Sequence, residues 1–164
     1  LGRIGKHVAK RCKGLGMKVY FYDPKVEDKN YIKVKNIIYL FKKSNIVSLH
    51  LHYKKNLENI ISYRNFVVQK KPSYFINTSR GEFLNENSLI KSLKNKILSG
   101  AALDVISNNL KFPLNFNNNK LLNFYSKNSE INLIITPKIG GSTSEARLIT
   151  EKYLIDQIIK FKSI

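Results

Sequence analysis

The chain has 164 residues, of which 43% are hydrophobic, enough for one domain with a sizeable core but short of two full domains. Its formal net charge of +18 comes from 29 lysines and arginines against 11 acidic residues. These cations are scattered and are not arranged as a basic face interleaved with stacking aromatic residues, so a general bias toward lysine, asparagine and isoleucine explains the charge better than a nucleic-acid site. We expect weak, salt-sensitive binding to polyanions and no specific nucleic-acid partner.

Cysteine content and hydropathy exclude further classes of protein. Cys12 is the single cysteine, which excludes a disulfide framework and a thiolate metal cluster, and we expect no bound metal. No apolar run approaches the ~18 residues that a membrane span needs, so we expect no membrane partner. The chain starts at Leu1 without a signal peptide, which predicts a cytoplasmic protein and a start that is a cut within a longer sequence.

Hydrophobic periods near 3.6 and near 2 alternate along the chain, which is typical of helices alternating with the strands of a parallel sheet. The expected helices span residues 3–13, 36–44, 56–73 (as one or two short helices), 85–98 and 143–160, with a helical turn at 120–127. The expected strands span residues 18–24, 45–52, 74–82, 100–106 and 132–138. The fold class that we expect is α/β, a Rossmann-type doubly wound parallel sheet with helices on both faces, lacking its first strand in this fragment.

The segment Gly2-Arg3-Ile4-Gly5 spaces its glycines as the second and third of G-x-G-x-x-G, and the first glycine would lie ahead of the chain. Glycine lets the backbone approach a pyrophosphate, and the start of the following helix offers free N–H groups and positive potential. Asp23 ends the next strand, 18 residues after Gly5, near the ~20 expected for the acid that accepts both ribose hydroxyls and repels a 2′-phosphate. The pattern predicts NAD binding; a tight strand–helix turn followed by an ordinary Asp-Pro turn is the alternative.

Four blocks of sequence cover nearly the whole chain: GRIGKHVAKRCKGLGMKVYFYDP, NIVSLHLH, FINTSRGEFLNENSLIKSLKNKILSGAALDV and NLIITPKIGGSTSEA. In this order they resemble the NAD-dependent D-isomer-specific 2-hydroxyacid dehydrogenases, and the last block is similar to the D-3-phosphoglycerate dehydrogenase branch. The resemblance implies hydride transfer between NAD(H) and a small D-2-hydroxy or 2-oxo acid, and a homodimer by analogy. It also implies an NAD-binding domain over residues 1–142 and a closing helix over 143–164 that would return to a substrate domain outside the chain.

Arg80, within Thr78-Ser79-Arg80-Gly81, matches the family's arginine that holds the substrate carboxylate and polarises the keto oxygen. Its planar, permanently charged guanidinium suits a bidentate carboxylate contact at the mouth of a parallel sheet. An arginine that only ends a strand is the alternative.

The resemblance implies further contacts to the cofactor. Asp104 matches the aspartate that accepts from the nicotinamide carboxamide, with an ordinary strand-end residue as the alternative. His50 and Leu51 end a strand beside the nicotinamide ribose and would contribute backbone contacts, whereas His52 stands where relatives usually have proline and receives no role. The other expected cofactor contacts are Thr78, Ser79, Gly140 and Gly141.

Lys138 and Asn109 depart from the family's pattern. Lys138 stands where the family has its general-acid histidine, and Asn109 stands where it has the glutamate that keeps this histidine charged. An imidazole, with a reference pKa of ~6.5, needs a carboxylate partner to stay protonated near neutral pH, whereas a lysine amine, at ~10.4, does not. The two changes are therefore coordinated, and Lys138 would be the proton donor beside Asn109. The alternative is a catalytically inactive NAD-binding or sensing homologue; a third class, a basic nucleic-acid binder, rests on charge alone.

Overall fold

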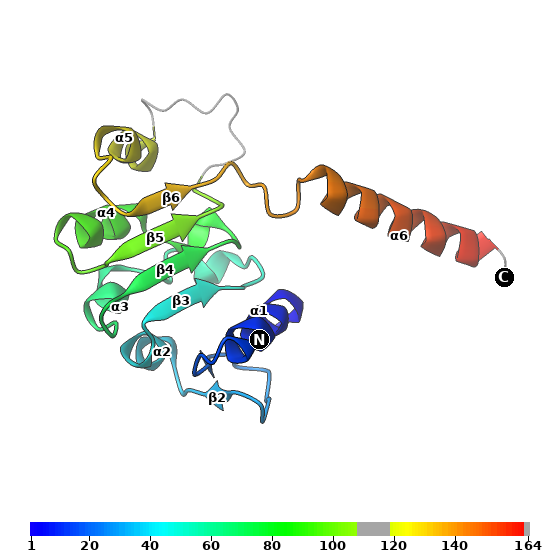
Figure 1. Cartoon of the computed structure of the whole chain (residues 1–164), viewed down its shortest axis with the longest axis horizontal. Coiled ribbons are helices and arrows are strands. Elements are labelled where there is room, and N and C mark those ends of the chain that lie inside the picture. The colour runs from blue at the N-terminus through cyan, green and yellow to red at the C-terminus, as the bar shows by residue number, and fades with distance from the viewer. Residues whose placement is uncertain (108–118, 163–164) are drawn as a thin grey trace.

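Strands and helices alternate in the computed structural model, which describes residues 1–107 and 119–162 (Figure 1). The strands are β1 (Tyr20–Phe21), β2 (Ile32–Lys33), β3 (Ile46–Leu49), β4 (Tyr74–Asn77), β5 (Gly100–Leu103) and β6 (Leu133–Ile135). The helices are α1 (Arg3–Gly14), α2 (Ile37–Lys43), α3 (Tyr63–Val67), α4 (Glu86–Lys94), α5 (Lys120–Lys127) and α6 (Ser144–Lys162). Two 3₁₀ turns, η1 (Lys55–Leu57) and η2 (Gly81–Phe83), follow β3 and β4.

The strands β3, β4, β5 and β6 form a parallel sheet in that order, seen as neighbouring arrows in Figure 1. A helix lies in each connection: α3 after β3, α4 after β4 and α5 after β5. The register places Asn77 opposite both Leu49 and Leu103, so three strands end at the same level. The expected α/β class and parallel sheet are confirmed.

The strands β1 and β2 form a separate two-stranded parallel pair. The sequence does not predict β2, because this strand has two exposed residues and no hydrophobic run. Hydrogen bonds define it instead: Ile32 N–H donates to the Val19 carbonyl (3.0 Å), and Val34 N–H donates to the Phe21 carbonyl (2.9 Å). Among the described residues, β1 pairs with β2 alone and β3 with β4 alone, so each has an unpaired edge. A further strand ahead of the chain stays a prediction.

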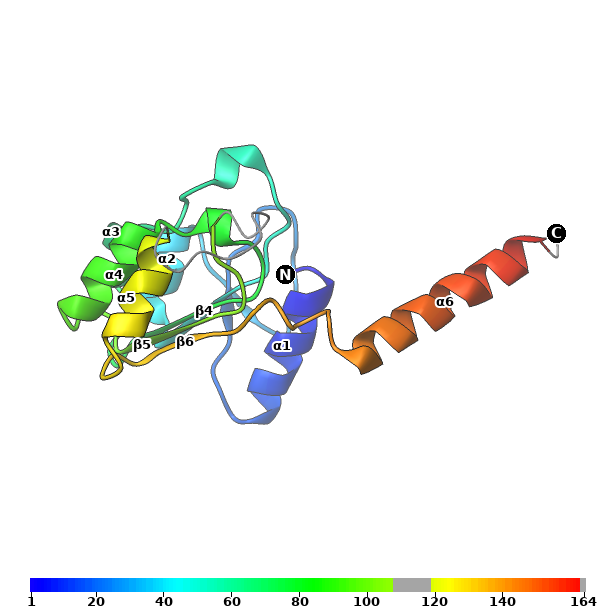
Figure 2. The ribbon, with the colours of Figure 1, turned by 90° about the horizontal axis from the view of Figure 1, so that it is seen from above.

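The helices α2, α3, α4 and α5 form a layer on one face of the four-stranded sheet, whereas α1 extends on the other side (Figure 2). Asparagine begins three of the helices in this layer. The side-chain oxygens of Asn36, Asn85 and Asn119 each accept an N–H group of the first helical turn, a contact that stabilises a helix by ~1 kcal/mol. The asparagine-rich composition thus supplies helix caps.

Three phenylalanines join the helix layer to the sheet. Phe41 of α2, Phe66 of α3 and Phe75 of β4 are fully buried, and their ring centroids lie 5.3 to 6.4 Å apart. Burial alternates along β4, so that Phe75 and Asn77 are buried while Tyr74 is exposed. Because of this alternation, the strand that anchors the core also ends on a buried polar residue.

The helix α6 projects away from the sheet and its helices (Figures 1 and 2). Large apolar side chains are exposed along it: Leu148, Ile149, Tyr153, Leu154, Ile155, Ile158 and Phe161. None of the helices within residues 1–107 and 119–162 combines the length and the apolar character that crossing a membrane requires.

The aromatic cluster predicts the response to truncation at β4. Phe75→Ala should lower the free energy of unfolding by about 3–5 kcal/mol, because it removes a fully buried ring and leaves a cavity between α2 and α3. Urea denaturation followed by circular dichroism measures the change. The matched control is the neighbouring Tyr74→Ala, at a side chain that is 37% exposed, and it should lower the free energy of unfolding much less. Equal losses at both positions would contradict this packing.

Candidate active site

The candidate site is formed where the chain leaves the carboxyl ends of β3, β4, β5 and β6. Because these strands are parallel and in register, the residues that follow them meet at one edge of the sheet, where ligands bind in open α/β folds. The segments that follow the strands are 50–51, 78–81, 104–107 and 136–141. They contain most of the residues that the sequence singles out.

Arg80 is presented by a turn that Asn77 holds. The Asn77 side chain is fully buried; its Oδ1 accepts the Ser79 N–H (3.0 Å) and the Ser79 hydroxyl (2.9 Å), and its Nδ2 donates to the Arg80 carbonyl (2.9 Å). The Arg80 side chain is exposed, and its Nη1 donates to the Ser79 carbonyl (2.7 Å). No carboxylate of the described residues forms an ion pair with Arg80, so its guanidinium is available to an anionic ligand.

Gly81 brings this turn against the segment that follows β5. A Cβ atom added at Gly81 would lie 2.0 Å from the carbonyl carbon of Ile106 and 2.3 Å from the amide nitrogen of Ser107. Real Cβ atoms do not approach backbone this closely, so only glycine fits. The turn that carries Arg80 is therefore packed against the backbone just after Asp104.

Asp104 in turn holds the loop that carries Lys138. Its Oδ1 accepts the Thr136 hydroxyl (2.5 Å) and the Ile139 N–H (2.9 Å), and its Oδ2 accepts the Gly140 N–H (3.0 Å). Within this loop Lys138 adopts a left-handed backbone conformation, with φ of 58°, and its side chain is exposed.

The hydrogen bonds to Asp104 also set its charge. Partial burial raises the pKa of Asp104, but the donors on Thr136, Gly140 and Ile139 and the positive charge of Lys138 outweigh burial and hold this pKa below its ordinary value. The carboxylate is therefore ionised at neutral pH, and it anchors the loop as a charged acceptor.

The first turn of α1 is an open anion-binding surface. Gly2 precedes the helix in an extended conformation, no side chain caps this end, and the first turn contains no acidic residue. Gly5 is buried, and a Cβ atom there would touch the Cβ of His50 at 3.5 Å, so α1 begins close to the end of β3. Burial lowers the pKa of His50 and favours its neutral form. The helix start thus provides positive potential at the edge where the other segments meet.

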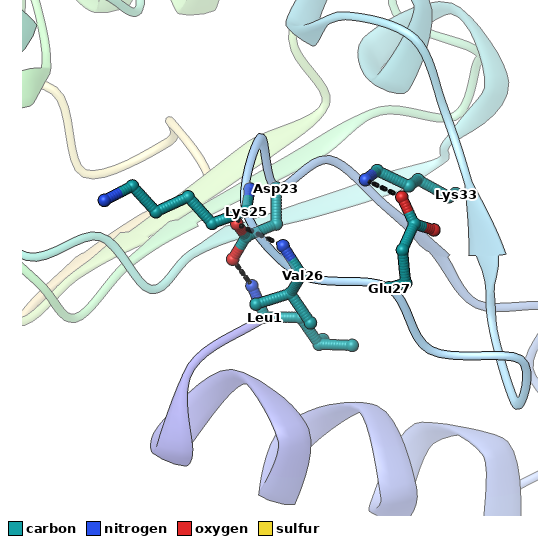
Figure 3. Close-up of polar contacts among 6 residues, drawn as sticks. All are labelled: Leu1, Asp23, Lys25, Val26, Glu27 and Lys33. Atoms are coloured by element: carbon teal, nitrogen blue, oxygen red, sulfur yellow. Dashed lines mark hydrogen bonds and ion pairs between the residues drawn. The ribbon is translucent and has the colours of Figure 1, made fainter.

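Asp23 follows β1 and lines a pocket of about 520 Å³. Its Oδ1 accepts the N–H groups of Lys25 (2.9 Å) and Val26 (3.2 Å), and its Oδ2 accepts from the amino group of Leu1 (Figure 3). Burial raises the pKa of Asp23, but these donors and the positive charge of the amino group lower it overall. The pocket is lined by Tyr22, Asp23, Pro24, Lys33, Val34 and Lys35.

These features fit an adenine dinucleotide. An uncapped helix start can hold a pyrophosphate, and an ionised carboxylate in a neighbouring pocket can accept the hydroxyls of a ribose. In the described ranges, no group of three or more His, Cys, Asp or Glu side chains is placed to hold a metal ion.

Most of the residues that the sequence singles out lie at the carboxyl edge of the sheet and at the start of α1. The structure brings Asp104, Lys138 and Gly140 together in one hydrogen-bonded turn, and packs the turn of Arg80 beside it. Gly2, Arg3, Ile4 and Gly5 begin α1; Leu51 follows β3; Thr78 and Ser79 follow β4; Gly141 follows Gly140. Asn109 lies outside the described residues, so its relation to Lys138 stays a prediction.

Two residues of this edge are not predicted by the sequence. Asn77 and Thr136 look like ordinary polar residues at strand ends, yet Asn77 is completely buried and Thr136 donates to Asp104. The sequence does contain a signal that Asn77 is buried: it stands two residues after Phe75 and therefore lies on the same face of the strand.

The chain is similar to known proteins in sequence and in fold. Residues 1–140 match the family model described as D-isomer specific 2-hydroxyacid dehydrogenase, NAD binding domain. The chain is 32% identical over 164 residues to a glyoxylate reductase of Thermococcus litoralis, and 30% identical over 162 residues to a D-3-phosphoglycerate dehydrogenase of Synechocystis. These alignments cover 98% and 96% of the chain, but 46% and 27% of the relatives.

A solved structure is also similar. The D-isomer specific 2-hydroxyacid dehydrogenase of Lactobacillus delbrueckii ssp. bulgaricus, in its NAD complexed form, matches with a TM-score of 0.81 at 27% identity. The match covers 99% of this chain and 51% of that one. The chain thus spans about half the length, or less, of these relatives.

The anchoring of the 136–140 turn by Asp104 predicts a pH dependence. Folding lowers the pKa of Asp104 below its ordinary value of 3.8. The stabilisation that its carboxylate gives to the 136–140 turn is therefore fully present above pH 3.8 and is lost as the pH falls below 3.8 through the lowered pKa. The amide NMR signals of Ile139 and Gly140 should report this titration, and Asp104→Asn should abolish it. Asp156→Asn, on α6, is the control that should leave it unchanged. A midpoint at or above 3.8 in the wild type would contradict the assignment.

Proposed function

The chain belongs to the D-isomer specific 2-hydroxyacid dehydrogenase family, in which it is the NAD-binding domain, and we propose that the protein containing it transfers hydride between NAD(H) and a small D-2-hydroxy or 2-oxo acid. The observation that carries this proposal is a pair of cationic turns at one sheet edge, each held against the segment that follows β5. One presents Arg80 and the other Lys138, and the carboxylate between them, on Asp104, is committed to hydrogen bonds.

Residues of both sheets would hold the cofactor. The first turn of α1, Gly2 to Gly5, would bind the pyrophosphate, and Asp23 would accept from the adenosine ribose. The nicotinamide half would lie over the edge of the four-stranded sheet, against Leu51, Thr78, Ser79, Asp104, Gly140 and Gly141. NAD, when bound, supplies the hydride acceptor or donor of the reaction.

Arg80 would bind and polarise the acid. Its guanidinium is exposed and free of carboxylate partners among the described residues, and it can donate two parallel hydrogen bonds to a substrate carboxylate. This contact fixes the orientation of C2 and its oxygen, and the same positive charge stabilises negative charge that develops on that oxygen during reduction.

Lys138 would move the proton. In reduction of a 2-oxo acid, C2 receives a hydride and its oxygen receives a proton from the Nζ of Lys138; in oxidation of the hydroxy acid the amine takes that proton back. The side chain of Lys138 is exposed on the loop that Asp104 holds, which leaves its Nζ accessible to a ligand at this edge of the sheet. The rival proposal, an inactive NAD-binding homologue, rests on the departures at Lys138 and Asn109 from the family's acid–base pair.

Several finer features remain proposals of the family resemblance. They are a substrate like that of D-3-phosphoglycerate dehydrogenase, a homodimer and a cytoplasmic location. We also propose the domain boundaries 1–142 and 143–164, with α6 packing on a part of the protein outside this chain. The exposed apolar side chains of α6 support that packing, because large apolar side chains gathered on one exposed element mark a contact surface.

The proton-transfer role predicts a selective loss at Lys138. In the protein that contains this chain, Lys138→Met should lower kcat for glyoxylate reduction by about 10²- to 10⁴-fold, because it removes the proton donor. The dissociation constant for NADH should change little, and stopped-flow absorbance at the nicotinamide band measures both. Lys127→Met, at the end of α5, is the control. Unchanged turnover in Lys138→Met would rule out the lysine acid, and a wild type that binds NADH but reduces no 2-oxo acid would favour the inactive homologue.

The ribose contact predicts a change in cofactor preference. Asp23→Asn should weaken NADH binding about 10-fold or more, since hydrogen bonds to a charged acceptor are worth ~1.5–3 kcal/mol. It should also narrow the gap between NADH and NADPH, because the amide no longer repels a 2′-phosphate. Fluorescence titration with each cofactor measures the two constants. Asp28→Asn, in the same loop between β1 and β2, is the matched control; an equal effect there would sink the assignment.

A further inference from the structure

The side chain of Asn77, at the end of β4, forms three hydrogen bonds with the turn that follows the strand. It is fully buried at the last position of β4, and both of its polar atoms are satisfied by the turn that follows. The Oδ1 atom receives two donors from Ser79, and the Nδ2 atom donates to the carbonyl of Arg80. The side chain therefore fixes the backbone on both sides of the peptide unit that leads into Arg80.

The backbone of Asn77 connects the same turn to Asp104. The Asp104 N–H donates to the Asn77 carbonyl at 2.9 Å, one step beyond the last paired residues of β4 and β5. Asp104 then holds the loop of Lys138 through Thr136, Ile139 and Gly140. A single residue thus contacts both the support of Arg80 and the support of Lys138.

We propose that Asn77 is a positioning residue for the dehydrogenase reaction: it sets where the Arg80 guanidinium meets the substrate carboxylate. The inference rests on the proposed function. Asn77 does not touch the substrate; it acts by holding the backbone of the 77–80 turn. An arginine fork must lie within a few tenths of an ångström of its carboxylate to form two hydrogen bonds, so loosening of this turn weakens substrate binding more than cofactor binding.

The chain offers a closely matched control in Asn65. This asparagine is also fully buried, and its Oδ1 accepts the N–H (2.8 Å) and the hydroxyl (3.3 Å) of one serine, Ser62. It lies in α3, within the helix layer and away from the carboxyl edge of the sheet. The Asn65 Nδ2 has no hydrogen-bond partner in the part of the chain that the structure describes, so a variant at Asn65 removes the same two kinds of acceptor bond from a buried site, without a donor bond and without touching the turn of Arg80.

The experiment compares Asn77→Ala with Asn65→Ala in the complete protein. We expect the KM for glyoxylate to rise by about 10-fold or more in Asn77→Ala, the size of effect that follows from one misplaced charged hydrogen bond, and to rise more than the dissociation constant for NADH. Hydrogen exchange at the Ser79 amide should accelerate in the same variant. Asn65→Ala should lower the melting temperature and leave KM and the exchange of Ser79 unchanged.

The possible outcomes separate this inference from the proposed function. An active Asn77→Ala variant whose KM and Ser79 exchange match the wild type overturns the positioning role alone. A wild-type protein that turns over no 2-oxo acid overturns the proposed function, and this role with it. Where Asn77→Ala does not fold, Asn77→Ser keeps a polar side chain that is too short to reach both Ser79 and the Arg80 carbonyl, and the same KM increase is expected of it.

Discussion

The alignment of parallel strand ends is the constraint on which the candidate site depends. Leu49, Asn77 and Leu103 stand opposite one another, and the ladder continues one step further through the Asp104 N–H to the Asn77 carbonyl and the Thr136 N–H to the Leu103 carbonyl. A shift of one residue would turn each side chain to the opposite face of the sheet. The register therefore decides that Asn77 points into the core and that the turns after β4, β5 and β6 meet.

Charge is distributed over these turns in a way that suits an anionic substrate. Asp104 is ionised, but its two oxygens already accept three hydrogen bonds from the 136–140 turn. The negative charge of Asp104 is therefore stabilised by groups of the protein itself. Arg80, in contrast, has no carboxylate partner among the described residues. The uncapped start of α1 adds further positive potential on the cofactor side. The result is an edge that attracts carboxylates and phosphates through fixed groups, with the wider net charge of the chain playing no specific part.

The sequence predicts most of the fold because most of its signals are local. The helix expected over residues 3–13 is α1, and the helix over 36–44 is α2 with Asn36 as its cap. The expected short helices over 56–73 appear as η1 and α3, and the chain between them bridges to Leu84. The strand that the sequence misses depends on a pairing partner: β2 has no hydrophobic pattern and exists through its pairing with β1.

The site divides in the same way between what sequence predicts and what it does not. The glycines of α1, Asp23, Arg80 and Asp104 stand at the ends of recognisable elements, so their positions follow from the element pattern. The bonds of Asn77 do not, because an asparagine before Thr-Ser-Arg could cap, turn or face solvent. Only the folded structure shows that its side chain is fully buried and bonded to Ser79 and Arg80.

The backbone at Lys138 bears on the choice between an active and an inactive protein. A non-glycine residue with φ of 58° is sparsely populated and costs on the order of 1–3 kcal/mol unless its surroundings enforce it. Here the Lys138 N–H donates to the Thr136 carbonyl at 3.0 Å, and Asp104 holds the two following N–H groups, so the conformation is imposed from both sides. Lys96 adopts the same conformation (φ 53°) in the turn after α4, so the strain alone marks no function. What Lys138 has in addition is the Asp104 anchor on the next two residues, which fixes the direction in which its side chain leaves the loop, as a proton donor at this position would require.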